Sequence, residues 1–99
     1  MAKFYLTNKA VSDLNEIWNY TYDEWSEKQA DTYYKMLLTN CQHIADNPSL
    51  GRKYSEIRED LFGLKANKHI IFYRVISSQK IEITRILHGR MDLRKRLSK

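Results

Sequence analysis

The sequence predicts an α+β fold with the element order β-α-α-β-β-β, in which an N-terminal helical hairpin packs on one face of a twisted antiparallel sheet. Residues 8–47 repeat apolar side chains every three or four positions, which is the period of an amphipathic helix. Residues 61–88 are instead dense in β-branched and aromatic side chains, interrupted by short polar turns, as in a strand meander. The 99 residues suit one domain that spans residues 1–99.

The chain is expected to begin with a strand over residues 3–7, whose exposed edge could pair with another chain. Asn8 is expected to cap the first helix, because its side chain can accept a hydrogen bond from the first turn. The apolar face of this helix consists of Ala10, Leu14, Ile17, Trp18, Thr21 and Trp25.

A second helix is expected to follow after a very short link, which implies an antiparallel helical hairpin. Ser26 and Gln29 have the spacing of a capping box at its start. It must end near Asn47, because a residue that precedes proline is driven out of the α region. Its apolar face consists of Ala30, Tyr33 or Tyr34, Leu37, Cys41, Ile44 and Ala45.

The C-terminal half is expected to hold three strands, over residues 61–67, 69–76 and 81–88. Residues 52–60 are polar and are predicted to form at most one helical turn. The last strand alternates Ile81, Ile83, Arg85 and Leu87 on one side with Glu82, Thr84, Ile86 and His88 on the other. Neither side is purely polar, so this strand is predicted to be central and partly covered on both faces. Residues 91–97 are expected to add one or two helical turns.

The net charge of +5 comes entirely from the C-terminal end of the chain. Residues 1–84 hold eleven basic and eleven acidic side chains, whereas residues 85–99 hold six basic side chains and one acidic side chain. The helical segment 8–47 has three basic and seven acidic side chains, a charge of −4. The basic end could therefore meet nucleic acid or an acidic protein partner, or form a solvated tail.

Several classes of protein and site are excluded by composition. The longest apolar run, residues 70–73, is too short to cross a membrane, and residues 1–9 lack a signal-peptide core, so a cytoplasmic protein is predicted. Cys41 has no partner for a disulfide, and the three histidines lie far apart in sequence. Three scattered glycines cannot form a phosphate loop. No metal and no cofactor are predicted.

One group of side chains could carry chemistry if the last two strands pair. Metal-free RNA cleavage can be catalysed by arginines that bind the phosphate together with a histidine that transfers a proton. The members of this group are Arg74, Arg85, His88 and Arg90. Two structural alternatives stay open: a histidine at a strand end can act as a hydrogen bonder, and Asp92 can pair with Arg90 or Arg94.

Aromatic side chains crowd the predicted helical hairpin. They are Tyr20, Tyr22, Trp25, Tyr33 and Tyr34. Five large aromatics exceed what one small core face usually holds, so some are expected to be exposed as anchors for a partner, and others to pack on the sheet.

The chain resembles the ParE branch of the RelE/ParE toxin superfamily over nearly its whole length. The resemblance rests on Asp13-Leu14 with Ile17, Trp25 followed by Gln29-Ala30, the Asn47–Gly51 string, Ile57-Arg58, Leu61, and above all His69–Arg74 and Arg85–Asp92. No single motif is sufficient, but their order and spacing together are specific.

This resemblance implies a toxin of a type II toxin–antitoxin system, active in plasmid or chromosome maintenance. ParE-type toxins share the fold of ribosome-dependent RNases but generally lack their catalytic set. They poison DNA gyrase and block replication, and a ParD-like antitoxin neutralises them with a segment that is disordered until it binds. The resemblance thus implies that the toxin contacts DNA only indirectly, through gyrase or through the antitoxin. We therefore expect no enzyme, and either a homodimer or a hetero-oligomer with the antitoxin.

Two alternatives to a gyrase inhibitor remain open from the sequence. One is a RelE-like ribosome-dependent mRNA endonuclease, which would use the four side chains of the possible RNA-cleaving group. The other is a degenerate toxin whose main role is to pair with its antitoxin.

Site residues are assigned by matching position and by charge, and no catalytic residue is assigned to a gyrase inhibitor. The residues expected to contact the target are His88, Arg90, Met91, Asp92, Arg94 and Arg96. The residues expected to contact the antitoxin are Trp18, Tyr22, Trp25, Tyr33, Leu37, Arg74 and Arg85.

Overall fold

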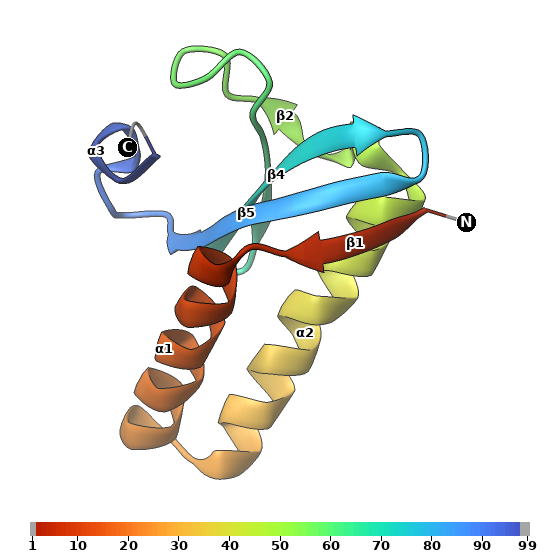
Figure 1. Cartoon of the computed structure of the whole chain (residues 1–99). Coiled ribbons are helices and arrows are strands. Elements are labelled where there is room, and N and C mark those ends of the chain that lie inside the picture. Colours follow the sequence, from red (N-terminus) through yellow and green to blue (C-terminus); the bar gives the residue numbers. More distant parts are fainter. Residues whose placement is uncertain (1, 98–99) are drawn as a thin grey trace.

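The computed structural model describes residues 2–97 and has the predicted elements in the predicted order, with a 3-10 helix and a short strand added after the second helix (Figure 1). The elements are β1 (Lys3–Leu6), α1 (Asn8–Glu24), α2 (Glu27–Asp46), the 3-10 helix η1 (Pro48–Leu50), β2 (Arg52–Lys53), β3 (Phe62–Ala66), β4 (His69–Ser77), β5 (Lys80–His88) and α3 (Leu93–Leu97). The two-residue strand β2 was not predicted, because its residues are exposed and polar. The expected C-terminal helical turn is confirmed as α3.

The five strands form one mixed sheet in the order β1-β5-β4-β3-β2. Strands β2 to β5 pair antiparallel, which confirms the predicted meander. Strand β1 lies parallel to β5, from Lys3 opposite Lys80 to Leu6 opposite Ile83, so the prediction of a wholly antiparallel sheet is wrong for this pair. A parallel pair of strands needs a long connection, and here the connection between β1 and β5 consists of all the elements from α1 to β4.

Strand β5 is central, as predicted, but its side chains do not alternate strictly. Phe72 pairs with Arg85 and Tyr73 pairs with Ile83, so Thr84 is an extra residue in a β-bulge. The Thr84 hydroxyl donates a hydrogen bond to the Phe72 carbonyl at 3.1 Å. The bulge puts Ile83 and Ile86 into the same core cluster, which corrects the predicted alternation.

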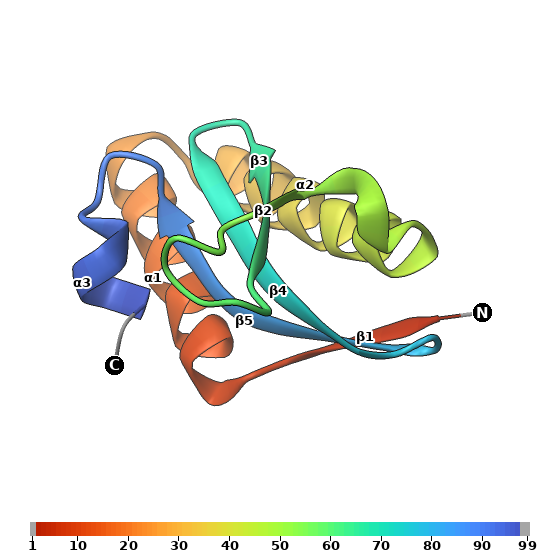
Figure 2. The same ribbon diagram turned by 90° about the horizontal axis from the view of Figure 1, so that it is seen from above.

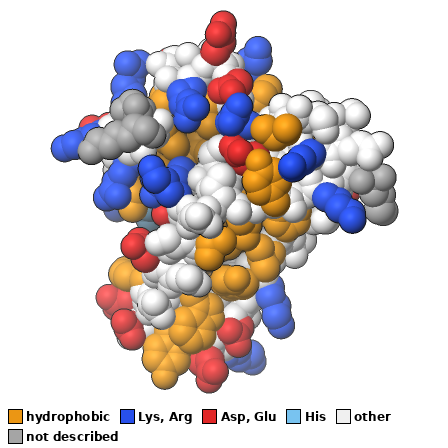
Figure 3. All heavy atoms as spheres, in the orientation of Figure 1, with side chains coloured by type: hydrophobic (Ala, Val, Ile, Leu, Met, Phe, Trp, Pro, Cys, Tyr) orange, Lys and Arg blue, Asp and Glu red, His pale blue; other side chains and the backbone are white. Residues whose placement is uncertain are grey.

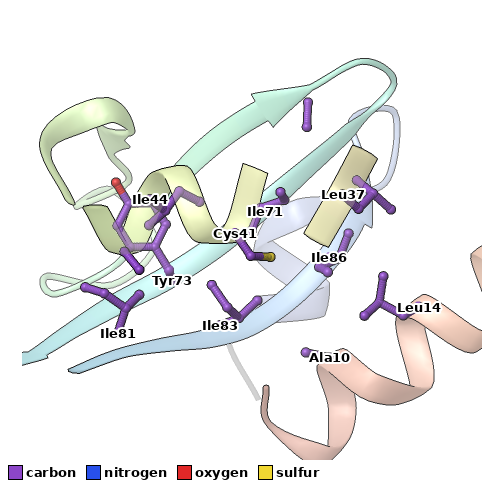
Figure 4. Close-up of a cluster of buried hydrophobic side chains, with 12 residues drawn as sticks. Ala10, Leu14, Leu37, Cys41, Ile44, Ile71, Tyr73, Ile81, Ile83 and Ile86 are labelled. Atoms are coloured by element: carbon purple, nitrogen blue, oxygen red, sulfur yellow. The ribbon is translucent and has the colours of Figure 1, made fainter. Parts of the chain in front are cut away.

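The main core lies between the helical hairpin and the sheet. In Figure 4 the side chains of α1 and α2 point toward those of β4 and β5. Its largest fully buried side chains are Leu14, Leu37, Ile44, Ile71, Tyr73, Ile81, Ile83, Ile86 and Cys41. Burial raises the pKa of the Cys41 thiol to about 12, so this cysteine is an unreactive filler, as predicted.

The opposite face of the sheet is covered by the β2–β3 loop and α3. Figure 2 shows the loop crossing over the central strands. Its residues Tyr54 and Leu61 pack with Phe72, Leu87 and Leu97. The sheet is therefore buried on both faces near the end of β5, and α3 is held there by an apolar contact.

Helix ends follow from local hydrogen bonds. The hydroxyl of Thr7, one residue before the predicted Asn8, accepts a hydrogen bond from the Ala10 N–H at 3.1 Å, so the predicted cap was misplaced by one residue. Ser26 caps α2 as predicted, accepting from the Gln29 N–H at 3.1 Å. Helix α2 ends at Asp46, before Pro48. The buried Tyr73 hydroxyl then donates to the Pro48 carbonyl at 2.6 Å, which ties the turn to the sheet.

Candidate functional site

A groove of about 1190 Å³ lies between the helical hairpin, the adjoining ends of β4 and β5, and the C-terminal segment. The helical hairpin contributes Glu16, Ile17, Tyr20, Trp25, Lys28, Tyr33 and Met36 to the lining of the groove. The sheet contributes His69, His88 and Arg85, which is bound to Asp13 of α1. The C-terminal segment contributes Arg90, Met91 and Arg96. The groove thus joins the two regions that the sequence marks as unusual, the aromatic hairpin and the basic end.

An ion pair between Arg85 and Asp13 borders the groove and fastens α1 to β5. The Arg85 Nε lies 2.8 Å from Asp13 Oδ2 and its Nη2 lies 2.9 Å from Oδ1, a bidentate pair. Asp13 Oδ2 also accepts the Ile86 backbone N–H at 3.0 Å, and Asp13 keeps only 7% of its surface exposed. The hydrogen bond to Asp13 is the largest cause of the raised pKa of Arg85. This guanidinium is therefore engaged within the chain.

Three proton-carrying side chains meet where α2 crosses the ends of β4 and β5. The Tyr33 hydroxyl lies 2.6 Å from His69 Nδ1. His69 and His88 face each other in the strand register, with their ring centroids 5.3 Å apart in an edge-to-face arrangement. Burial, aided by the nearby His88, lowers the pKa of His69 to about 4, and Asp13 opposes this shift. His69 is therefore a neutral imidazole at neutral pH.

The turn after β5 orients His88. The Arg90 backbone N–H donates to His88 Nδ1 at 3.1 Å, so a neutral His88 carries its proton on Nε2. The Gly89 N–H donates to the Lys68 carbonyl at 3.0 Å, which holds this turn against the β3–β4 turn. His88 thus offers a hydrogen-bond donor beside the exposed Arg90.

The predicted convergence of the four RNA-cleaving candidates is wrong. Arg74 lies toward the other end of β4, opposite Glu82, whereas His88 lies opposite His69. The Arg74 Nε lies 2.7 Å from Asp60 Oδ2, and the Arg74 Nη1 lies 3.3 Å from Glu82 Oε1. Strand alternation places Arg74 on the sheet face away from the helical core. Because Arg85 is paired with Asp13, two members of the predicted set remain in the groove, His88 and Arg90, and Arg90 has no ion pair within residues 2–97.

The residues predicted to contact an antitoxin are divided by the structure. Leu37 has no exposed surface and packs in the core, so it cannot contact a partner of the folded chain. Trp18 stacks on Tyr22 with centroids 5.2 Å apart, outside the residues that line the groove. Trp25 and Tyr33 do line the groove. Arg74 and Arg85 are engaged in ion pairs.

The residues predicted to contact the target are divided in the same way. His88, Arg90, Met91 and Arg96 line the groove. Asp92 Oδ1 instead accepts the Lys95 backbone N–H at 3.3 Å, at the start of α3. Asp92 and Arg94 border a smaller hollow on the surface, together with Lys95, Glu56 and Ile57.

Two groove residues were missed in the sequence. Tyr20 was named among the aromatics of which some were expected to be exposed anchors but was not assigned to the antitoxin, yet it lines the groove and keeps 64% of its surface exposed. His69 was set aside because the histidines are distant in sequence. The predicted strands over residues 69–76 and 81–88 already contained the signal, because pairing them antiparallel across the short turn between them brings His69 opposite His88.

The pKa of His69 predicts a loss of stability in acid. The unfolded chain, with a histidine pKa near 6.5, binds this proton before the folded chain does, so stability should fall as the pH drops from about 6.5 to about 4. The imidazole is partly exposed, so solvent screening reduces the loss to about 1–2 kcal/mol. Urea unfolding of the wild type and His69→Gln at pH 7 and pH 4.5 measures it. An identical pH dependence of the two proteins would contradict the prediction.

Comparison with known proteins identifies the chain. The family model described as the ParE toxin of type II toxin–antitoxin systems, parDE, matches residues 4–93. The chain belongs to the ParE toxin family. It is 38% identical over 96 residues to Toxin ParE1 of Mycobacterium tuberculosis, covering 97% of this chain and 98% of that toxin. It is 32% identical over 97 residues to Toxin ParE1 of Caulobacter vibrioides, covering 98% and 99%.

The fold of this ParE toxin is also that of a solved structure. The chromosomal ParDE TA system from P. aeruginosa contains a chain with a TM-score of 0.77 and 18% identity, covering 89% of this chain and 96% of that one. This likeness confirms the α+β architecture. Among residues 2–97, no helix combines the length and the apolar character needed to cross a membrane. Within the same range, no cluster of three His, Cys, Asp or Glu side chains could hold a metal ion.

Proposed function

We propose that this ParE toxin acts in the cytoplasm by inhibiting DNA gyrase, and that a ParD-like antitoxin neutralises it by occupying the groove. The observation that carries the proposal is the groove itself, where exposed aromatics face an exposed basic segment. An acidic amphipathic segment that folds on binding can bury apolar side chains against Tyr20 and Trp25 and place carboxylates near Arg90 and Arg96.

The same basic segment is proposed to contact the target. Arg90, Arg94 and Arg96 are exposed and have no ion pair among residues 2–97. An antitoxin that covers Arg90 and Arg96 would mask part of the surface needed for toxicity. Contact with DNA is proposed to be indirect, through gyrase or the antitoxin.

The antitoxin-binding part is tested by truncating the exposed aromatics of the groove. Tyr20→Ala and Trp25→Ala should each weaken the affinity for the ParD-like antitoxin by about 2 kcal/mol, or roughly 30-fold, because exposed aromatics are typical interface anchors. Isothermal titration calorimetry measures the change. Leu50→Ala is the matched control, since Leu50 is exposed but lies outside the groove. Unchanged affinity of both aromatic variants would place the antitoxin elsewhere.

An RNase remains the second candidate because of the cluster formed by Tyr33, His69 and His88. This cluster supplies proton-transfer groups beside Arg90, although Arg74 and Arg85 are engaged elsewhere. His88→Ala separates the two candidates. A gyrase inhibitor should keep its activity within about tenfold, whereas an RNase built on this site should lose at least about 100-fold in the rate of mRNA cleavage on ribosomes.

A further inference from the structure

The hairpin tip, residues 16–31, is both aromatic and acidic. Tyr20 and Trp25 keep 64% and 70% of their surfaces exposed. Glu16 and Glu24 lie four residues before and after Tyr20, and side chains at this spacing share one face of a helix. The whole tip holds five acidic side chains and one lysine, a charge of −4. It therefore presents exposed aromatic rings among negative charges.

The C-terminal rim of the groove, residues 90–96, has the opposite charge. Arg90, Met91 and Arg96 line the groove, and all three are exposed. The rim holds four basic side chains and one aspartate, a charge of +3. In Figure 3 blue side chains gather over the upper part of the molecule, and orange side chains at the lower end of the hairpin stand among red ones.

The hairpin tip is far enough from the sheet for its charge to act separately from that of the rim. Asp13 marks the place where α1 is fastened to β5, through its bonds to Arg85. Glu24, the last residue of α1, lies about 16 Å further along the helix axis, because a helix rises about 1.5 Å per residue. Figure 1 shows the tip projecting away from α3. This distance is about twice the length of about 8 Å over which physiological salt screens exposed charges.

The chemistry of the hairpin tip suits a cation. A guanidinium or an ammonium group is attracted to the face of a tyrosine or tryptophan ring. Such a group on Tyr20 would lie between the carboxylates of Glu16 and Glu24. An aspartate or glutamate of a partner would instead be repelled by the same carboxylates. A segment that is acidic along its whole length therefore fits the C-terminal rim but not the tip.

We propose that the groove selects a partner segment whose charge changes sign along its length, with arginine or lysine side chains at the hairpin tip and carboxylates at the C-terminal rim. The inference rests on the proposed function, in which this segment belongs to the antitoxin, and it adds which side chains lie at each end. About five residues of an extended segment, or about eleven of a helix, span the 16 Å between its basic and acidic parts. The sign change distinguishes the cognate segment from one that is acidic throughout.

Calorimetric titration of the full toxin chain, made by cell-free synthesis, with the full-length ParD-like antitoxin tests the sign of the charge at the tip. Glu16→Gln with Glu24→Gln should weaken the affinity about tenfold, and Glu16→Lys with Glu24→Lys should weaken it about 100-fold, because attraction is first lost and then reversed. The matched control is Asp46→Asn with Glu59→Gln, which changes the net charge as the glutamine variant does, at exposed positions outside the groove. The control should bind within about twofold of the wild type, and circular dichroism should show that all variants are folded.

A charge swap then identifies the basic side chain of the partner. The arginines and lysines of the antitoxin segment are replaced one at a time by glutamate. The residue that lies on the hairpin tip should lose affinity for the wild-type toxin and regain most of it with the toxin that carries Glu16→Lys and Glu24→Lys. The absence of any such residue would overturn the proposal.

The affinity of the glutamine variant decides the sign. Tighter binding would overturn the proposal, because it would show that the antitoxin places carboxylates at the tip, and unchanged affinity would overturn it as well. Arg90→Gln with Arg96→Gln separates this failure from that of the proposed function, since an antitoxin in the groove should bind this variant about tenfold more weakly whatever lies at the tip. Weaker binding of the arginine variant alone overturns only the charge pattern, whereas unchanged affinity of both variants also overturns the groove as the antitoxin site.

Discussion

Replacing Asp13 with alanine is expected to lower the free energy of unfolding by about 3–5 kcal/mol, because it leaves the partly buried Arg85 guanidinium without a counterion. The same change also removes the acceptor of the Ile86 backbone N–H. Together these bonds hold α1 against the bulged part of β5, and hence one wall of the groove against the other. Urea unfolding followed by circular dichroism measures the loss.

The matched control is Asp60→Ala, which breaks an exposed ion pair with Arg74. The Asp60 side chain keeps 54% of its surface exposed, so this loss should stay below about 1 kcal/mol. A double variant, Asp13→Leu with Arg85→Met, should recover part of the loss, since it leaves no unpaired charge. An Asp13→Ala protein as stable as the Asp60→Ala protein would contradict a structural role for the pair.

Neutralising Arg90, Arg94 and Arg96 together with glutamine is expected to abolish toxicity while leaving the fold intact. These side chains are exposed, so the unfolding free energy should change by less than about 1 kcal/mol. Three charged contacts of about 1 kcal/mol each correspond to a roughly 100-fold weaker affinity for the target. Growth of cells after induction without antitoxin measures toxicity, with the amount of soluble toxin measured in parallel.

A second triple variant controls for net charge. Lys9, Lys35 and Lys65 are also exposed but lie outside the groove, and their replacement by glutamine changes the net charge equally. This variant should still arrest growth. Equal toxicity of the arginine triple variant and the wild type would show that the basic segment does not contact the target.

The helices and most strands could be predicted because their signals are local. Periodicity, the Ser26 cap and Pro48 mark the ends of α2 within a residue. The bulge at Thr84 was missed, although Thr84 and Arg85 form two consecutive polar positions between Ile83 and Ile86 and so interrupt the alternation of the strand. Arg85 was assigned to phosphate binding because the last two strands were expected to pair, whereas its guanidinium binds Asp13, which is distant in sequence.

The candidate site was predicted less completely than the fold because it depends on tertiary placement. Trp25 was placed on the core-facing side of its helix, but α1 ends at Glu24 where the hairpin projects beyond the sheet, so Trp25 is exposed (Figure 1). Leu37 was assigned to a partner although its position on the apolar face already indicated burial. Composition alone did predict the acidic hairpin and the basic end, because summed charge does not depend on register.

Incubation of the antitoxin-free toxin with gyrase, ATP and supercoiled plasmid tests the proposed function most directly. The product is treated with detergent and protease and scored for linear DNA. The account predicts linear DNA that requires both gyrase and the toxin and that disappears when the ParD-like antitoxin is added. Folded toxin that yields no linear DNA and leaves supercoiling unchanged would contradict gyrase as the target.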